Sequence, residues 1–235
     1  MIPVLITALV NRPDLLTRLA RSIDTPVKRK LVIDNGQTGW KRRGWSVVTP
    51  PFLGLGWPGA LNFGIEQTPD APYWIGVNND AWFPRGALRD LANRIEAADG
   101  PLVLHHEWTV FAMNRAVVET VGLFDVQSFY PVYYDDTDYS YRCYLAGIPV
   151  VDDREWVLEG DIGQTNVASQ TIRADENLAR ANNRTWSLNH DAYVEKWGGP
   201  PGAERFTTPW GMKYGVPLPL WATRPSMVAR DARRW

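Results

Sequence analysis

Apolar runs alternate with amphipathic segments from the first residue of this chain onward. Residues 2–10 form an apolar run, and Asn11-Arg12-Pro13-Asp14 follows it. That tetrapeptide supplies a cap, a proline for the first helical turn and an early acid, and leucines at helical spacing come next. The pattern predicts a buried strand that leads directly into a helix.

The same alternation continues along most of the chain and predicts an α/β fold. Turn residues such as Asn35-Gly36 and Pro50-Pro51 punctuate the segments. Because strands and helices alternate, we expect a largely parallel, doubly wound sheet flanked by helices. The predicted strands are residues 2–10, 30–34, 45–48, 73–77, 102–104, 109–113 and 149–151, and the predicted helices are residues 12–23, 59–65, 85–97, 114–121, 135–146 and 170–196.

Length and composition favour a single domain. The chain has 235 residues, of which 45% are hydrophobic and 22% are charged, so it can bury a substantial core. The residues after Gly198 are rich in proline. We therefore expect one domain over residues 1–200 and a C-terminal extension over residues 201–235 that wraps the surface.

Charge and cysteine content exclude several kinds of protein. A net charge of −1 argues against wholesale binding of nucleic acid, which normally requires a marked excess of Lys and Arg. Cys143 is the only cysteine, so an intramolecular disulfide and a thiolate metal site are excluded, and a reducing, cytoplasmic location is expected. The apolar start lacks a basic leader and is too short for a membrane span.

Polar residues follow two of the predicted strands at their carboxyl ends, where open parallel sheets bind ligands. These residues are Asp34 and the segment Asn78-Asn79-Asp80. Oxygen ligands at such an edge suit a nucleotide whose diphosphate carries Mg²⁺ or Mn²⁺. From spacing alone, a helix cap or turn before Pro84 explains Asp80 equally well, and an Asx turn into Gly36 explains Asp34 better.

Asp135-Asp136-Thr137-Asp138 is the densest carboxylate cluster. Acids are favoured at a helix N-terminus, which should also keep Asp136 ionised, and Asp138 is predicted to pair with Arg142 at i, i+4. Neighbouring tyrosines make a pocket in which one carboxylate could accept a proton. The histidines indicate less: His105 and His106 should face opposite sides of one strand, and a surface position is the usual explanation for His190.

Several blocks, taken in order, resemble the family 2 inverting glycosyltransferases. The similarity covers roughly residues 2–165, and the order of the blocks is more specific than any one of them. The matching blocks are Asn11-Arg12-Pro13-Asp14-Leu15-Leu16, Val32-Ile33-Asp34-Asn35-Gly36, the stretch GLGWPGALNFGI at residues 54–65, Val77-Asn78-Asn79-Asp80-Ala81, Val121-Gly122-Leu123-Phe124-Asp125, and Tyr134-Asp135-Asp136-Thr137-Asp138 with Arg142 and Gly147.

The resemblance implies a GT-A (Rossmann-like) fold and a UDP-, GDP- or dTDP-sugar donor. It implies that Asp80 holds Mn²⁺ or Mg²⁺, that Asp136 is the general base and that Asp135 orients the acceptor. An acceptor glycan, a protein side chain and a modified nucleobase all remain open. The implied donor-binding residues are Asp34, Asn35, Asn62, Asn78, Asn79 and Asp80.

The sequence departs from the family where many relatives carry a metal-binding histidine, some two dozen residues after the acid pair. That stretch contains Glu159 and Asp161. Either acid or the later His190 is a candidate substitute, and Asp80 alone is the remaining possibility. The segment at residues 196–202 is similar to the endings of small stand-alone transferases, including phage-encoded ones.

Two other functions fit parts of the sequence. Gly54, Gly56 and Gly59 form a literal G-x-G-x-x-G, which is typical of NAD-dependent oxidoreductases. That fingerprint normally follows the first strand, however, and Pro58 lacks the N–H that would help to bind a pyrophosphate. A non-catalytic module that binds a nucleotide sugar is the second alternative, against which the intact Asp80 and Asp136 argue.

Overall fold

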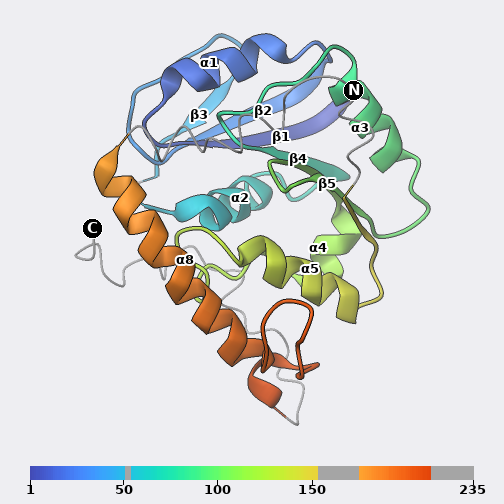
Figure 1. Cartoon of the computed structure of the whole chain (residues 1–235). Helices are drawn as coiled ribbons and strands as arrows, with labels where there is room; N and C mark the ends of the chain where they lie inside the picture. The colour runs from blue at the N-terminus through green and yellow to red at the C-terminus, as the bar shows by residue number, and fades with distance from the viewer. Residues whose placement is uncertain (51–53, 153–174, 213–235) are drawn as a thin grey trace.

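A computed structural model describes residues 1–50, 54–152 and 175–212 (Figure 1). Strands and helices alternate through most of these residues, as the hydrophobic pattern predicts. The strands are β1 (Ile2–Leu9), β2 (Val27–Asp34), β3 (Ser46–Val48), β4 (Tyr73–Val77), β5 (Val103–His106), β6 (Val110–Asn114) and β7 (Val150–Asp152). The helices are α1 (Pro13–Ser22), α2 (Gly56–Glu66), α3 (Ala87–Glu96), α4 (Arg115–Val121), α5 (Asp135–Leu145), α8 (Glu176–Trp197) and the short 3₁₀ helix η2 (Pro209–Gly211).

All of these strands belong to one seven-stranded sheet in the order β3-β2-β1-β4-β6-β5-β7. Six strands run in the same direction, and β6 alone runs against its neighbours β4 and β5. The predicted fold class, a single α/β domain with a mostly parallel sheet flanked by helices, is therefore confirmed.

Helices cover both faces of the sheet, which is why its central strands are apolar on both sides (Figure 1). Helices α1 and α3 pack on one face through Leu16, Leu19, Leu88 and Leu91. On the other face, α2, α4 and α5 contribute their own apolar positions, which are Ala60, Leu61, Ile65, Val117, Val121, Tyr139 and Cys143.

The carboxyl ends of the central strands meet at one edge of the sheet. Leu9 at the end of β1 pairs in register with Asp34 at the end of β2, and β4 lies on the other side of β1. The loops after β1, β2 and β4 are therefore neighbours at this edge. This arrangement brings the predicted donor-binding segments to one side of the sheet.

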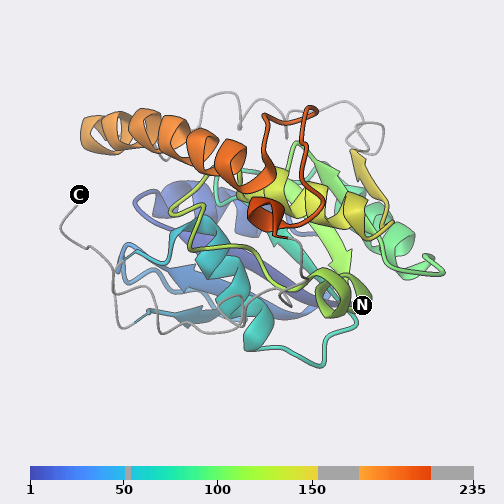
Figure 2. The ribbon, with the colours of Figure 1, turned by 90° about the horizontal axis from the view of Figure 1, so that it is seen from below.

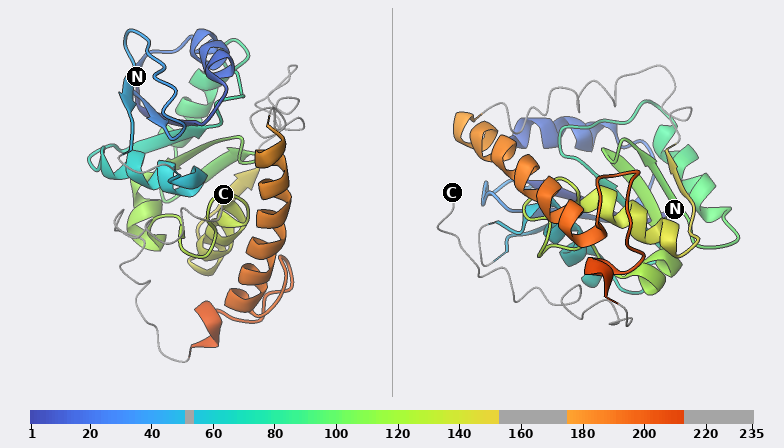
Figure 3. Two further views of the ribbon diagram at one scale, coloured as in Figure 1. Left: turned by 90° about the vertical axis from the view of Figure 1, so that its left-hand side faces the viewer. Right: turned by 60° about the horizontal axis from the view of Figure 1, so that its bottom comes forward.

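The long helix α8 crosses the outside of the domain beside α5 (Figures 1 and 2). Its last turns and the segment that follows fold back on each other, because the N–H groups of Arg205 and Phe206 both donate to the carbonyl oxygen of Trp197. Figure 3 shows α8 along one side of the molecule with this returning segment at its end. The rest of the predicted C-terminal extension, residues 213–235, lies outside the described residues.

None of the helices in the three described ranges has both the length and the apolarity that crossing a membrane requires.

Candidate functional site

Asp34 closes the loop that follows β2. Its side chain is fully buried, and its two carboxylate oxygens accept hydrogen bonds from the N–H groups of Thr38 (3.0 Å) and Gly39 (2.9 Å) and from the Thr38 hydroxyl (3.1 Å). These bonds account for an aspartate at this position through loop structure. A contact with a nucleobase stays a prediction that would use the remaining acceptor capacity of the carboxylate.

Asn35 connects the same loop to the start of α2. Its Nδ2 donates to the carbonyl oxygen of Gly56 (3.2 Å), whereas its buried Oδ1 accepts no hydrogen bond from the described residues. A buried amide oxygen without a donor is costly, so this position suits a ligand that supplies an N–H or O–H.

The segment 78–81 forms a turn at the end of β4, in which the Ala81 N–H donates to the Asn78 carbonyl oxygen. Asn79 and Asp80 are both buried. The alternative of a helix cap for Asp80 is wrong, because α3 begins at Ala87 and Gly86 occupies its N-cap position. Asp80 is therefore a turn residue at the strand end.

Two arginines of the α1 region lie next to this turn. Arg18 donates from Nη2 to the carbonyl oxygen of Asp80 (3.0 Å), and its guanidinium stacks over the ring of Trp82 at 3.9 Å. The pKa of Arg12 is raised, chiefly by its hydrogen bond with Asp14, and the charge of Asp80 adds to the effect. Because Arg12 is already paired with Asp14 (Nη2–Oδ2, 2.7 Å), Arg18 is the cation next to this turn whose charge favours a phosphorylated ligand.

The side chain of Asn62 is used inside the protein. It donates to the carbonyl oxygen of Phe124 and accepts from the N–H of the same residue, both at 2.9 Å. This pair of bonds fixes the 122–125 segment to α2. The structure therefore gives Asn62 a structural role, and its predicted contact with the donor is untested.

Close packing explains the glycine-rich turn. A Cβ on Gly56 would lie 2.4 Å from the carbonyl oxygen of Pro131, and one on Gly54 would lie 2.5 Å from the Tyr130 hydroxyl. The N–H of Trp57 also donates to Pro131 (2.8 Å). These glycines let α2 approach residues 130–131, so the match to a dinucleotide-binding fingerprint has a structural explanation of its own.

The acid pair begins α5 directly after a strained segment. Tyr133 and Tyr134 have φ values of 76° and 64°, which side-chain-bearing residues adopt at a cost of about 1–3 kcal/mol each. Asp135 is buried, whereas Asp136 is partly exposed and its Oδ1 accepts from the N–H and the hydroxyl of Thr137. The strain fixes the direction in which the chain enters the helix and so the position of both carboxylates.

Burial raises the pKa of both acids. For Asp135 the negative charge of Asp136 adds to the effect, and for Asp136 the hydrogen bonds from Thr137 oppose it. Desolvation thus outweighs the favourable hydrogen bonds at the helix N-terminus, and the expectation that Asp136 is ionised at neutral pH stays a prediction. Asp136 is consequently a stronger base than an exposed aspartate.

We expect a group transfer that uses Asp136 as its base to lose activity on the acid side at a pH above 3.8, the ordinary aspartate pKa. Because the folded-state pKa is raised, the carboxylate is already protonated, and inactive as a base, at pH values where an exposed aspartate stays ionised. The pH dependence of kcat, measured with saturating substrates, tests this. An acid limb at or below the ordinary aspartate pKa would contradict it.

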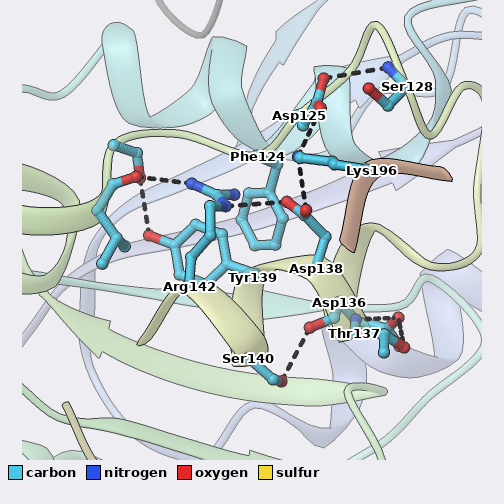
Figure 4. A network of polar contacts seen from close by, with 12 residues as sticks. Phe124, Asp125, Ser128, Asp136, Thr137, Asp138, Tyr139, Ser140, Arg142 and Lys196 are labelled. Atoms are coloured by element: carbon cyan, nitrogen blue, oxygen red, sulfur yellow. Dashed lines mark hydrogen bonds and ion pairs between the residues drawn. The ribbon is translucent and has the colours of Figure 1, made fainter. Parts of the chain in front are cut away.

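Asp138 belongs to a buried ionic network (Figure 4). It pairs with Arg142 (Nε–Oδ2, 2.9 Å), as the i, i+4 spacing predicts, and also with Lys196 of α8 (Nζ–Oδ1, 2.6 Å). Lys196 in turn pairs with Asp125 at 2.9 Å. Although burial alone would raise it, the charges of Arg142 and Lys196 hold the pKa of Asp138 below its ordinary value.

Helix α8 also holds the strained segment before the acid pair. The buried Asn189 donates from Nδ2 to the carbonyl oxygens of Val132 (2.8 Å) and Tyr133 (3.1 Å). Sequence analysis missed both Asn189 and Lys196. The available signal was a stripe of residues at helical spacing, which the structure shows to be buried: Thr185, Asn189, Tyr193 and Lys196.

The predicted site residues form two groups, the strand-end group (Asp34, Asn35 and residues 78–80) and the acid pair (Asp135 and Asp136). Hydrogen bonds through the start of α2 connect them. Asn35 binds Gly56 at the start of α2, and the next residue, Trp57, binds Pro131, four residues before the acid pair. The strand-end group and the acid pair therefore flank the N-terminus of α2.

Of the predicted metal ligands, Asp80 belongs to the strand-end group and His190 to α8. The Nδ1 of His190 lies 3.2 Å from a carboxylate oxygen of Asp191, and its ring contacts Tyr134. Glu159 and Asp161 lie outside the described residues. Among residues 1–50, 54–152 and 175–212, no three acids, histidines or cysteines gather as a metal site.

No family model matches this chain, and no curated protein matches it. Solved structures with a similar arrangement include TarS 1-349 from S. aureus, with 14% identity and a TM-score of 0.49, for which the alignment covers 66% of this chain and 59% of that one. They also include the mannosyltransferase PcManGT from Pyrobaculum calidifontis in complex with GDP-Man and Mn²⁺, with 14% identity, a TM-score of 0.48 and 81% and 73% of the two chains. A third is the 2-C-methyl-D-erythritol 4-phosphate cytidylyltransferase from Francisella tularensis, with 11% identity, a TM-score of 0.40 and 73% and 100% of the two chains.

Proposed function

We propose that this protein is a glycosyltransferase that moves a sugar from a nucleotide-sugar donor to an acceptor hydroxyl with inversion. The observation that carries the proposal is the presence of two acidic groups: Asp80 in the turn after β4, next to Arg18, and the Asp135-Asp136 pair at the start of α5, whose pKa values are raised. Inverting transfer needs two such groups, one on the leaving-group side and one on the acceptor side.

The strand-end group would bind the donor. A nucleobase or ribose bound beside Asp34 and Asn35 would donate a hydrogen bond to the Oδ1 of Asn35, which accepts none from the described residues. Asn78 and Asn79, directly after β4, would contact the diphosphate. Arg18 supplies positive charge beside them.

A divalent metal fits this group through one protein carboxylate. Asp80 is a buried oxygen ligand at the strand end, and Mg²⁺ or Mn²⁺ typically needs one or two carboxylates when phosphates provide the rest. When bound, the ion would offset the negative charge that builds up on the departing diphosphate. His190 stays a predicted second ligand.

The acid pair would act on the acceptor. As the acceptor oxygen forms its bond to the anomeric carbon, the bond from that carbon to the diphosphate breaks, and the hydroxyl proton passes to a carboxylate oxygen of Asp136. Attack from the face opposite the diphosphate inverts the anomeric configuration. Asp135, which is buried and has the more strongly raised pKa, would orient the acceptor.

Replacement of Asp80 by Ala should abolish the dependence of nucleotide-diphosphate binding on Mn²⁺. The carboxylate is the direct protein ligand in the proposal, so its loss leaves the ion to the phosphates alone. Calorimetric titration with UDP and GDP, with and without Mn²⁺, measures the effect. The matched control is Asp99→Ala, an exposed acid in the loop before β5. Unchanged affinity in Asp80→Ala with Mn²⁺ present would show that the metal is held elsewhere or is not used.

The proposed function is tested by screening nucleotide sugars for slow, metal-dependent hydrolysis without an acceptor. Thermal unfolding with NAD, UDP or GDP separates the cofactor classes, since a ligand at a hundredfold its Kd adds about 2.7 kcal/mol. Stabilisation by NAD alone would favour the oxidoreductase. Stabilisation by a nucleotide sugar without any hydrolysis would favour the non-catalytic binding module.

A further inference from the structure

Three aromatic rings form a wall beside the acid pair, and of these only His190 has a predicted role in the donor site, as a second metal ligand. Trp186 and His190, one turn apart on α8, stack with their planes 13° apart and their centroids 5.8 Å apart. Tyr134, the residue before the acid pair, contacts both, at centroid distances of 5.7 Å and 5.5 Å. We call Tyr134, Trp186 and His190 the aromatic wall.

The wall is open to solvent. Trp186 is 50% exposed although it is the largest apolar side chain of this part of α8, and His190 and Tyr134 are partly exposed. Tryptophan and tyrosine are enriched at binding interfaces, and here Trp186 lies beside two further rings rather than singly on the surface. Figure 2 shows the first turns of α8 along the outside of the ribbon.

The wall is tied to the acid pair in position. Tyr134 is the N-cap residue of α5, and Asn189, between the two ring-bearing residues of α8, binds the carbonyl oxygen of Tyr133. Asp136 follows Tyr134 by two residues, in the first turn of the helix that Tyr134 caps. A molecule stacked on the wall would therefore lie close to Asp136.

The charges around the wall select the kind of ligand. Asp136 lies two residues after Tyr134, and the exposed Asp191 has a carboxylate oxygen 3.2 Å from the Nδ1 of His190, so two acids flank the wall. A negative field repels nucleic acid and phosphorylated acceptors. A pyranose is uncharged and has a flat apolar C–H face for a ring to cover, with hydroxyls around its rim, whereas a serine or threonine side chain has no such face.

We propose that the aromatic wall is the acceptor subsite and that the acceptor is an uncharged glycan, whose sugar ring stacks on Trp186 and presents a hydroxyl to Asp136. The part of this inference that makes the bound sugar an acceptor rests on the proposed transferase function. The binding of a sugar ring to the wall can be measured without catalysis.

The experiment compares Trp186→Ala with Leu188→Ala. Leu188 is 52% exposed on the same helix, so the two variants remove similarly exposed apolar side chains from different faces. Saturation-transfer NMR with methyl α- and β-glycosides of glucose, galactose and mannose, in the presence of UDP or GDP and Mn²⁺, measures binding. A single-stranded oligothymidine serves as the anionic probe.

We expect at least one glycoside to bind to the wild type and to Leu188→Ala, and to bind about tenfold or more weakly to Trp186→Ala, which is the usual scale for loss of a stacking partner. Trp186→Phe should restore much of the binding, because it restores a ring. Thermal unfolding of all variants should match the wild type, since the side chain is exposed.

Absence of glycoside binding to the wild type, or equal binding to Trp186→Ala, would overturn the proposal. Trp186-dependent binding of the oligothymidine in place of the glycosides would also overturn it and would indicate a nucleic-acid acceptor. Donor hydrolysis is measured separately on the same variants. If hydrolysis is absent while glycosides bind through Trp186, the transferase function fails and the sugar site stands; if hydrolysis is present and equal in all variants while binding fails, the reverse holds.

Discussion

Asp136→Asn should lower sugar transfer about a hundredfold or more and leave donor binding unchanged. The amide is nearly isosteric with the carboxylate and can still accept from Thr137, but it cannot take the proton of the acceptor hydroxyl. Loss of a general base typically costs between about a hundredfold and ten-thousandfold. Turnover with a saturating donor, together with calorimetric donor affinity, measures both quantities.

The same variant should be as stable as the wild type at neutral pH, or more stable. Because the folded-state pKa of Asp136 is raised, the wild type loses stability as the pH rises above the unfolded value of 3.8 toward the folded value. An asparagine has no such loss. Urea unfolding at acidic and neutral pH separates this effect from the effect on activity.

Asp90→Asn is the matched control. Asp90 is an exposed acid of α3, which packs on the face of the sheet opposite α5, so its loss removes one negative charge without touching the proposed base or the aromatic wall. We expect near-wild-type turnover. If Asp90→Asn lost as much activity as Asp136→Asn, the loss would come from the change in charge. If Asp136→Asn turned over normally with donor affinity intact, the base would be reassigned to Asp135 or the mechanism abandoned.

Local features of the site could be predicted from the sequence because short-range rules decide them. The strand ends that carry Asp34 and Asp80 follow from the hydrophobic pattern, and the Asp138–Arg142 pair follows from helical spacing. The desolvation of Asp136 depends on what packs around the helix. Helix position alone therefore does not give the direction in which its pKa shifts.

Contacts between segments that are distant along the chain could not be predicted from the sequence. The motif at Gly54, Gly56 and Gly59 looks like a phosphate-binding loop, yet in the structure Gly54 and Gly56 make room for residues 130–131, more than seventy positions away. Asn62 likewise was predicted to contact the donor, and the structure adds a role that the sequence did not indicate, two hydrogen bonds to the main chain of Phe124. The residue type determines which interactions a side chain can make, but tertiary packing determines which partner it binds in the folded protein.

The buried ionic network at Lys196 is another contact between distant segments that the sequence did not predict, and it has the largest expected effect on the free energy of unfolding. Lys196, Asp138, Asp125 and Arg142 are each at most 5% exposed, and they join α8, α5 and the 122–129 segment with two positive and two negative charges. Asp138 also accepts from the indole N–H of Trp197 (2.9 Å). The set is balanced, so each charge depends on the others to offset its desolvation.

Lys196→Met should therefore lower the free energy of unfolding by about 3–5 kcal/mol, because it leaves Asp125 and Asp138 buried with one cation, Arg142, between them. The methionine keeps most of the aliphatic volume, so the loss reports charge rather than a cavity. Urea unfolding measures it, with Lys28→Met, an exposed lysine of β2, as the control that should stay near the wild type.

The pH dependence distinguishes this ionic cause from a packing defect. The lowered pKa of Asp138 contributes stability above the unfolded value of 3.8, and this stability is lost as the pH falls through the folded value. Without the charge of Lys196, the folded-state pKa of Asp138 should rise, so the deficit of the variant should be largest at neutral pH and shrink in acid, where Asp138 is protonated in both proteins. A deficit of the same size at every pH would mean that Lys196 stabilises the fold through its packing and that its ion pairs contribute little.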